Sequence, residues 1–404
     1  MAYAHPGCTS SSRMHQDRPS HVELFPQDQA RLDYIHRQAS HATARLNPIG
    51  DSLLARVPTI IDCNISFYSY IIEIGLGTPT KFFFLTFDTG TDLTWTQCEP
   101  CVNCHTQKNP FYDPTKSFTF TNIPCDSSYC TQLDKFGCSS NFSCLYEEEY
   151  YDNSITNGSL IEDVLYFNND IIYNFVFGCG HNNTGVFDHE DGLLGLGRGP
   201  ISIINQTSQL YNEIFSYCLP SGPNKAGYLE LGRSVLGVKY TPMLTKPELP
   251  SFYFLNLTAI SVDGERLTLP PTIFSEPGTM LDSGTTFSYL PPTAYSALRS
   301  IFQKKMSNYP MAPPISNLDT CYNFTNYPTV LLPSISLIYD GEVMTNLHST
   351  GRILMFSEFI GCLPFVENED DSEVVIIGNM QYLTFNVVYD VGNSQIGFGP
   401  NGCS

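Results

Sequence analysis

Basic residues are scarce in this chain of 404 residues, which has 20 Lys and Arg against 40 Asp and Glu and a formal net charge of −20. Most of such a surface would repel a polyanion, which excludes nucleic-acid binding as the function. Charged residues of both signs make up only 15% of the chain, against 42% hydrophobic residues. This composition excludes a disordered or coiled-coil protein and indicates a folded chain, long enough for two or more lobes.

Long apolar runs are missing as well. No stretch reaches the roughly 18 residues that a membrane-spanning helix needs, and residues 1–22 contain no apolar run typical of a signal peptide. The chain ends at Ser404 without the hydrophobic tail of a GPI-anchor signal. We therefore expect no membrane anchor. We interpret the start of the sequence as incomplete or misassigned, not as the start of a cytosolic protein.

Several enzyme motifs are absent too. The sequence contains no Gly-x-Ser-x-Gly elbow, no His-Glu-x-x-His and no Gly-x-x-x-x-Gly-Lys loop. These absences argue against a serine hydrolase with that elbow, a zinc peptidase and a P-loop nucleotide hydrolase.

Cysteine, in contrast, is abundant: there are 14, and seven of them lie between positions 98 and 144. This density excludes a reduced cytosolic protein and predicts disulfides formed in an oxidising compartment. The cluster Cys98-x-x-Cys101-x-x-Cys104-His105 has the alternative of a metal site, but no second Cys/His pair at zinc-finger spacing accompanies it, so disulfides are favoured. Asn-x-Ser/Thr sequons also suit a secreted glycoprotein. The sequons lie at Asn64, Asn141, Asn157, Asn182, Asn205, Asn256 and Asn323.

Residues 1–56 differ from the rest of the chain. They carry a charge of about +1, which leaves −21 for residues 57–404, and they hold five of the nine His. Apolar residues at helical spacing predict a helix that begins near Asp28. The segment is either a pro-segment that covers an acidic site or a solvated leader without an inhibitory role. The helical positions are Leu32, Ile35, Ala39, Ala42 and Leu46, and the histidines are His5, His15, His21, His36 and His41.

From about Phe67 onward the sequence is typical of β structure. Short runs of Val, Ile, Tyr, Phe and Thr are punctuated by Gly and Pro, of which the chain has 29 and 28. The pattern predicts an all-β body with many hairpins. Helices are predicted over 293–306 and over 204–210. The clearest strand-like runs lie at 70–74, 82–87, 175–177 and 373–377.

An internal repeat divides this body into two halves. Segments 84–91 and 278–285 each lead from apolar residues into Asp-(Thr/Ser)-Gly-Thr. Each is followed at similar distance by two apolar residues and Gly, at 193–195 and 376–378. One such Asp-Thr-Gly is weak evidence, and the simpler interpretation of one copy is a turn carboxylate. Two copies in the same context predict duplicated lobes.

The chemistry of paired carboxylates explains the repeated motif. Gly after each Asp lets the opposing turn approach closely, and the hydroxyl residue between them can hydrogen-bond across the pair. Two such turns would bring Asp88 and Asp282 together, and two carboxyl groups in contact share one proton over an acidic range. The ionised group can deprotonate a water while the protonated group polarises a carbonyl. The motif therefore predicts peptide hydrolysis without a covalent intermediate.

These motifs, with several others, resemble the pepsin-like aspartic peptidases and, within them, the nepenthesin-type plant branch. The resemblance runs from about Tyr70 to Cys403. It implies an all-β, bilobal fold with a few short helices, no metal or cofactor, and a monomer that cleaves protein or peptide substrates. The motifs are Ile74–Pro79, Phe87–Gly90, Leu93–Cys98, Phe177–Gly180, Gly192–Gly197, Phe215–Pro220, Leu281–Thr285, Phe398 and Asn401–Cys403.

The resemblance also assigns roles to single residues. The catalytic pair is Asp88 and Asp282. Tyr150 would close over the substrate as the flap tyrosine, with Trp95 bonded to it. The flap departs from the family at Tyr151, which replaces a Gly and puts the rate and subsite preference in question. The active loops would be supported by Thr89, Gly90, Thr91, Ser283, Gly284 and Thr285.

The resemblance implies six disulfides and leaves Cys8 and Cys63 unassigned. The implied pairs are Cys98–Cys101, Cys104–Cys179, Cys125–Cys144, Cys130–Cys138, Cys218–Cys403 and Cys321–Cys362.

The expected protein is thus an aspartic endopeptidase, secreted or vacuolar, made as a zymogen. Its predicted parts are a pro-segment at 1–66, an N-terminal lobe at 67–240 and a C-terminal lobe at 241–404. The alternative is a catalytically silent pepsin-like protein that binds or inhibits partner enzymes, as plant xylanase-inhibitor relatives do. Because Asp88, Asp282, Tyr150 and Trp95 are all kept, the active enzyme is favoured.

Overall fold

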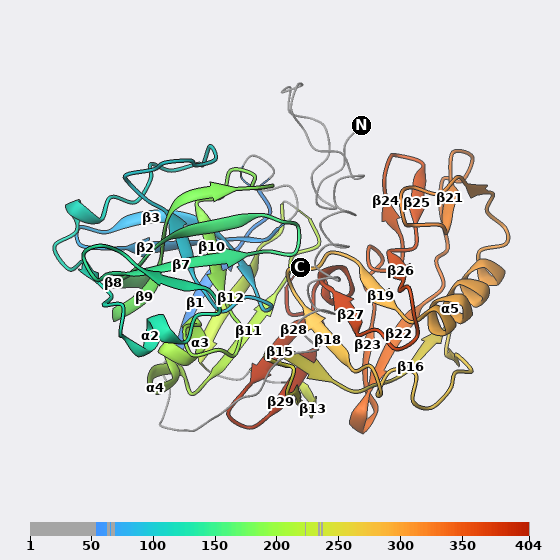
Figure 1. Ribbon diagram of the computed structural model, residues 1–404. Coiled ribbons are helices and arrows are strands. Elements are labelled where there is room, and N and C mark those ends of the chain that lie inside the picture. Colours follow the sequence, from blue (N-terminus) through green and yellow to red (C-terminus); the bar gives the residue numbers. More distant parts are fainter. Residues whose placement is uncertain are drawn as a thin grey trace.

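The computed structural model describes residues 54–62, 65, 69–222, 224–232, 235 and 237–403. Two lobes of twisted β-sheet lie side by side, the N-terminal lobe in blue to green and the C-terminal lobe in yellow to red (Figure 1). The predicted all-β, bilobal fold is confirmed. The predicted helix near residue 28, together with Cys8, Cys63 and Asn64, lies outside the described residues.

The N-terminal lobe is built on one large mixed sheet. Its strand order is β2-β3-β10-β4-β9-β8-β7-β6, with β5 paired to β8. Along β3 the side chains pass from exposed to buried as the strand approaches its C-terminal end, so this end lies inside the lobe. The strands are β2 (Ile71–Leu76), β3 (Lys81–Asp88), β4 (Trp95–Gln97), β5 (Thr121–Asn122), β6 (Phe136–Cys138), β7 (Cys144–Glu149), β8 (Ile155–Phe167), β9 (Asp170–Thr184) and β10 (Gly192–Gly195).

The C-terminal lobe divides its strands among three sheets, with the orders β14-β15-β18-β27-β19-β26, β17-β16-β22-β23 and β20-β21-β25-β24. Helix α5 (Pro292–Lys305), close to the predicted 293–306, packs on this lobe through Ala294, Leu298 and Phe302. The strands are β14 (Leu244–Lys246), β15 (Leu249–Leu255), β16 (Leu257–Val262), β17 (Glu265–Arg266), β18 (Thr279–Asp282), β19 (Ser288–Leu290), β20 (Met311–Ala312), β21 (Cys321–Asn323), β22 (Ile335–Tyr339), β23 (Val343–Asn346), β24 (Leu354–Met355), β25 (Ile360–Cys362), β26 (Phe365–Glu367) and β27 (Val375–Gly378).

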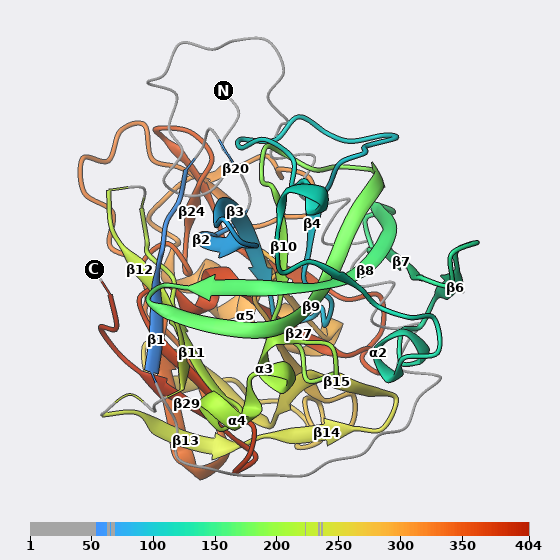
Figure 2. The ribbon, with the colours of Figure 1, turned by 90° about the vertical axis from the view of Figure 1, so that its left-hand side faces the viewer.

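A further sheet draws strands from both ends of the described chain. Its order is β1-β12-β11-β28-β29-β13, and Figure 2 shows β1 running beside β12. Buried Phe215 and Tyr389 stack at 4.5 Å between ring centroids, and Tyr253 of the C-terminal lobe contacts both rings. Strand β1 lies inside 1–66, the segment that the sequence assigned to the pro-segment. The strands are β1 (Leu54–Thr59), β11 (Ile214–Cys218), β12 (Gly227–Gly232), β13 (Lys239–Pro242), β28 (Asn386–Asp390) and β29 (Gln395–Gly399).

The helix predicted over 204–210 is wrong in its continuity, because the structure has two short helices there. The Thr207 hydroxyl donates to the Ile203 carbonyl at 2.6 Å, and its backbone leaves the helical region, which ends the first helix. Asn212, with φ 52°, ends the second. The remaining helices are α2 (Ser128–Thr131), α3 (Ile203–Gln206), α4 (Ser208–Tyr211), η1 (Pro114–Lys116), η2 (Asp340–Glu342) and η3 (Asn379–Tyr382).

Candidate active site

Each Asp of the internal repeat is the last residue of a buried strand. Asp88 ends β3 and is 3% exposed, and Asp282 ends β18 and is fully buried. In both lobes the apolar-apolar-Gly segment forms the next strand in parallel, and its Gly pairs with the Asp: Gly195 with Asp88 and Gly378 with Asp282. A Cβ on either Gly would come within 2.3 Å of a backbone carbonyl oxygen, so the close approach requires glycine.

A reciprocal pair of hydrogen bonds joins the two turns. The Thr89 N–H donates to Ser283 Oγ at 3.0 Å, and the Ser283 N–H donates to Thr89 Oγ1 at 3.0 Å. Because these residues directly follow the two Asp, Asp88 and Asp282 lie next to each other across the junction of the lobes. The sequence had assigned this joining role to the same two hydroxyl residues.

Each carboxylate is oriented by donors of its own turn. Asp88 accepts from the Gly90 N–H at 2.8 Å through Oδ1 and from Thr91 Oγ1 at 2.8 Å through Oδ2. The second turn repeats this pattern, with Gly284 at 3.1 Å and Thr285 at 2.5 Å. The six supporting residues named from the sequence therefore all contact the Asp pair or the partner turn.

The flap is the hairpin of β7 and β8, which crosses the N-terminal lobe. Tyr150 lies at its tip, and Trp95 Nε1, on buried β4, donates to its hydroxyl at 2.7 Å. Burial raises the pKa of Tyr150 well above its usual value, so this hydroxyl stays protonated. The structure thus brings together the two residues that the sequence placed in the flap.

The flap turn needs a left-handed residue at Asn153, and not at Tyr151. The Asn153 N–H donates to the Tyr150 carbonyl at 2.9 Å, and Asn153 itself has φ 64°. Asn tolerates this conformation better than most side chains, and Tyr151 is outside the left-handed region. The bulky residue at position 151 therefore imposes no backbone strain on the hairpin.

Two carboxyl groups near the flap, Asp92 and Glu148, were not predicted from the sequence. Burial raises the pKa of Asp92 to about 6, although Ser251 and the Gly199 N–H stabilise its charge. Burial, together with the charge of Asp92, raises the pKa of Glu148 to about 8. A signal existed for Glu148: it follows buried Tyr146 by two residues on β7 and so shares its face.

The disulfide pattern corrects four implied pairs: Cys98–Cys101, Cys104–Cys179, Cys125–Cys144 and Cys130–Cys138 are wrong. The implied pairs Cys218–Cys403 and Cys321–Cys362 are confirmed. In the described part of the chain the twelve cysteines form Cys98–Cys179, Cys101–Cys104, Cys125–Cys138, Cys130–Cys144, Cys218–Cys403 and Cys321–Cys362.

Strand and helix packing explain the corrected pairs. β4 and β9 run parallel, and the Cys98 N–H donates to the Gly180 carbonyl at 2.9 Å, so Cys98 lies beside Cys179 with Cα atoms 5.3 Å apart. Helix α2 packs on β7, which brings Cys130 to Cys144, both fully buried. Neither contact can be read from sequence spacing.

The sequons that the structure describes lie on both lobes. Asn141 and Asn205 are exposed, whereas Asn256 and Asn323 are partly buried. Asn157 and Asn182 pair directly across β8 and β9. Glycosylation at these positions stays a prediction.

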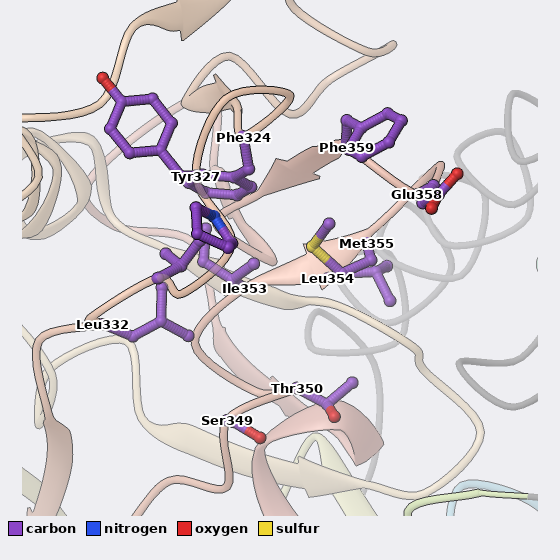
Figure 3. A pocket seen from close by; sticks show the side chains of 12 residues that line it. Phe324, Tyr327, Leu332, Ser349, Thr350, Ile353, Leu354, Met355, Glu358 and Phe359 are labelled. Atoms are coloured by element: carbon purple, nitrogen blue, oxygen red, sulfur yellow. The ribbon is translucent and has the colours of Figure 1, made fainter.

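Figure 3 shows a cavity in the C-terminal lobe, which has a volume of about 460 Å³ and is lined by neither Asp of the pair. Gly351, next to Thr350 of the cavity wall, packs so closely on Met380 that a Cβ would lie 2.6 Å from the Met380 carbonyl oxygen. The Met380 N–H donates to the Thr286 carbonyl, just after the second Asp-bearing turn. The lining is mostly apolar. It comprises Phe324, Tyr327, Pro328, Val330, Leu332, Ser349, Thr350, Ile353, Leu354, Met355, Glu358 and Phe359.

No group of three or more His, Cys, Asp or Glu among the described residues could hold a metal ion. No helix in the same part of the chain is long and apolar enough to cross a membrane.

Known proteins resemble this chain over nearly all of its described length. A family model described as xylanase inhibitor N-terminal matches residues 70–233, and one described as xylanase inhibitor C-terminal matches residues 252–400. An aspartyl protease family protein of Arabidopsis thaliana is 41% identical, covering 100% of this chain and 87% of the relative. Aspartic proteinase nepenthesin-2 of Nepenthes gracilis is 34% identical, covering 83% and 78%. The crystal structure of edgp matches with a TM-score of 0.71 at 20% identity, covering 88% and 96%, which concerns the fold alone.

Proposed function

We propose that this chain is an aspartic endopeptidase acting in acid. It belongs to the TAXi-type, pepsin-like aspartic protease family. We further propose that it is made as a zymogen, is secreted or vacuolar, and works as a monomer on protein or peptide substrates. The reciprocal hydrogen bonds between Thr89 and Ser283 carry the proposal, since they hold the two Asp-bearing turns together. One chain supplies both carboxyl groups.

In the proposed reaction, Asp88 and Asp282 share one proton, so one carboxyl is ionised and the other is not. The ionised carboxylate takes a proton from a water, whose oxygen attacks the carbonyl carbon of the peptide. The protonated carboxyl donates a hydrogen bond to the carbonyl oxygen. When the tetrahedral intermediate collapses, the C–N bond breaks and the departing amine takes a proton from the pair. The products are a carboxylic acid and an amine, with no covalent bond to the enzyme.

The test is digestion of an acid-denatured protein at a series of pH values, with and without a statine-type inhibitor. We expect cleavage that peaks in acid, fades toward neutral pH as the pair loses its shared proton, and is stopped by the inhibitor. A rate maximum above neutral pH, or cleavage that the inhibitor leaves unchanged, would contradict the proposal.

The zymogen proposal depends on charge. The head, residues 1–56, carries about +1 against −21 for the remainder, which favours its attachment at neutral pH. Acid neutralises carboxylates on the body, which weakens this attraction, and it charges the histidines of the head, so the head begins to repel itself. We expect the full chain to start slowly and to shorten in acid, and a chain starting at Leu54, which keeps β1, to start at full rate. Equal initial rates, with no shortening by N-terminal sequencing, would reject the pro-segment role.

A second candidate function is inhibition of a partner enzyme, which the xylanase-inhibitor description of both family models favours. The same protein preparation can be titrated into a xylanase assay. Loss of xylanase activity, together with no digestion of denatured protein in acid, would favour this candidate over the peptidase.

A further inference from the structure

Behind the flap tyrosine, aromatic rings continue into the Cys-rich loop of the N-terminal lobe. The His105 ring stacks on Phe187 at 4.9 Å between centroids and an interplanar angle of 25°. Phe187 meets Trp95 edge to face at 5.4 Å and 71°. Trp95 in turn donates to the Tyr150 hydroxyl at 2.7 Å. These four side chains, called the ring row below, connect the loop to the tip of the flap.

The loop end of the ring row is firmly held. The partly buried His105 ring bonds the Glu190 carbonyl through Nε2 at 2.9 Å. Its backbone N–H donates to Gln97 Oε1 at 3.0 Å, and Gln97 Nε2 donates to the His105 carbonyl at 3.0 Å. The loop also carries the Cys101–Cys104 disulfide. His105 is therefore a fixed ring, whereas the flap end lies on a hairpin turn.

We propose that His105 is a positioning residue for the flap: it fixes Phe187, Phe187 fixes the tilt of Trp95, and the tilt of Trp95 aims its N–H at Tyr150. A hydrogen bond prefers a donor angle above about 150° and weakens steeply below about 120°, so a rotation of the indole that bends this bond would loosen the tyrosine. His105 reaches the reacting atoms only through the other three rings. The effect on catalysis rests on the proposed peptidase function, but the effect on Trp95 does not.

Trp95 is the only tryptophan of the chain, so emission excited selectively in tryptophan reports the ring row. Emission is recorded at pH 7, since burial lowers the pKa of His105 and its ring is neutral there. His105→Ala should shift the emission to longer wavelength and increase quenching by acrylamide. His105→Phe keeps the stacked ring but loses the bond to Glu190, and should match the parent.

The control is His189→Ala. His189 is exposed and bonds the Thr106 carbonyl of the same loop at 2.9 Å through Nδ1. It should leave the emission and the activity of the parent unchanged. A red shift as large as that of His105→Ala would show that any loosening of the loop suffices, and would overturn the proposal.

Kinetics provide the second readout. We expect His105→Ala to lower kcat by roughly tenfold with little change in KM. The flap would still contact the substrate, but Tyr150 would no longer be held in one orientation. Combined with Tyr150→Phe, His105→Ala should add no further loss, since both changes break the same path. Independent effects of the two changes would overturn the proposal.

The proposal can still be tested if His105→Ala does not fold or if the parent protein has no peptidase activity. If His105→Ala does not fold, Phe187→Leu breaks the ring row at its middle and should give the same red shift, and an unchanged emission would refute the proposal. If the parent cleaves nothing, the peptidase function fails, but the emission of the variants still tests the positioning role.

Discussion

The two lobes carry the same Asp-bearing turn but surround it with different structures. In each, the strand ending in Asp runs parallel to the strand ending in Gly, which pairs antiparallel with a third strand. The N-terminal lobe adds the flap and, among the described residues, four disulfides of its own. The C-terminal lobe adds α5 and the Cys321–Cys362 disulfide. The shared three-strand unit is thus enough to hold a carboxylate, and the surroundings determine how that carboxylate is covered.

The lobes also differ in their buried acidic side chains, whereas the pKa of Asp113 in the N-terminal lobe is lowered, as is that of Asp263 in the other lobe. In the N-terminal lobe, burial raises the pKa of Asp92 to about 6 and of Glu190 to about 8. In the C-terminal lobe, hydrogen bonds from Ser334 lower the pKa of exposed Asp263. The first arrangement favours protonated carboxyls and the second favours ionised ones. The buried carboxyls of the N-terminal lobe should therefore make this lobe more stable in acid than at neutral pH.

The largest expected effect tests whether the two Asp-bearing turns contribute equally to the proposed reaction. Asp88→Asn and Asp282→Asn should each lower kcat by roughly 10⁴-fold or more, because the proposed reaction needs an ionised and a protonated carboxyl together. Both variants should melt within a few degrees of the parent. Substantial proteolysis by either variant would show that the lobes do not contribute equally.

The second prediction compares two disulfides that close chain loops of very different length. Cys218 and Cys403 are 185 residues apart, whereas Cys101 and Cys104 are three apart. Replacing the first pair by Ser should lower the free energy of unfolding by about 5 kcal/mol, and replacing the second pair by about 2 kcal/mol, from loop-closure entropy. Denaturant titration measures both. Equal losses would mean that local contacts, not chain entropy, set the cost.

The third prediction concerns pH. The unfolded pKa of Glu190 is 4.5 and the folded pKa is about 8, so between these values the folded protein keeps a proton that the unfolded chain has lost. The contribution of Glu190 to the free energy of unfolding should therefore be largest below pH 4.5 and fall as the pH rises to about 8. Glu190→Gln should reduce this fall by on the order of 5 kcal/mol.

Asp263→Asn is the matched change in the other lobe. Its lowered pKa places its titration below this window, so the slope between pH 4.5 and 8 should stay that of the parent. A change in slope for Asp263→Asn, or none for Glu190→Gln, would remove the difference between the lobes.

The smallest effect is expected at the flap. Tyr151→Gly should change kcat/KM by less than about threefold, because Tyr151 is outside the left-handed region. Asn153→Val should cost more, since a β-branched residue does not suit φ 64°. Asn153→Gly serves as the control and should retain activity. A tenfold increase in kcat/KM from Tyr151→Gly would show that the bulky side chain restrains the flap.

What the sequence could predict was local or repeated. The turns at Asp88 and Asp282 were predicted because each motif is contiguous and occurs twice. Strand β1 was missed because Pro58 and Arg56 give it little strand character, and Pro is tolerated there only because β1 is an edge strand. The pairing of Cys98 with Cys179 depends on the register of β4 and β9, which no local pattern encodes. The stack of His105 on Phe187 joins loops 82 residues apart, without any periodicity.

Strand β1 has a practical consequence for anyone who follows maturation by mass. It pairs with β12 over all six residues and buries Ala55 and Val57. If a peptidase cuts the chain between β1 and β2, the strand need not leave: it can remain as a separate peptide in the sheet. A native mass measurement would then report an intact particle, while denaturing electrophoresis would reveal two chains. The extent of processing should therefore be read from denatured protein.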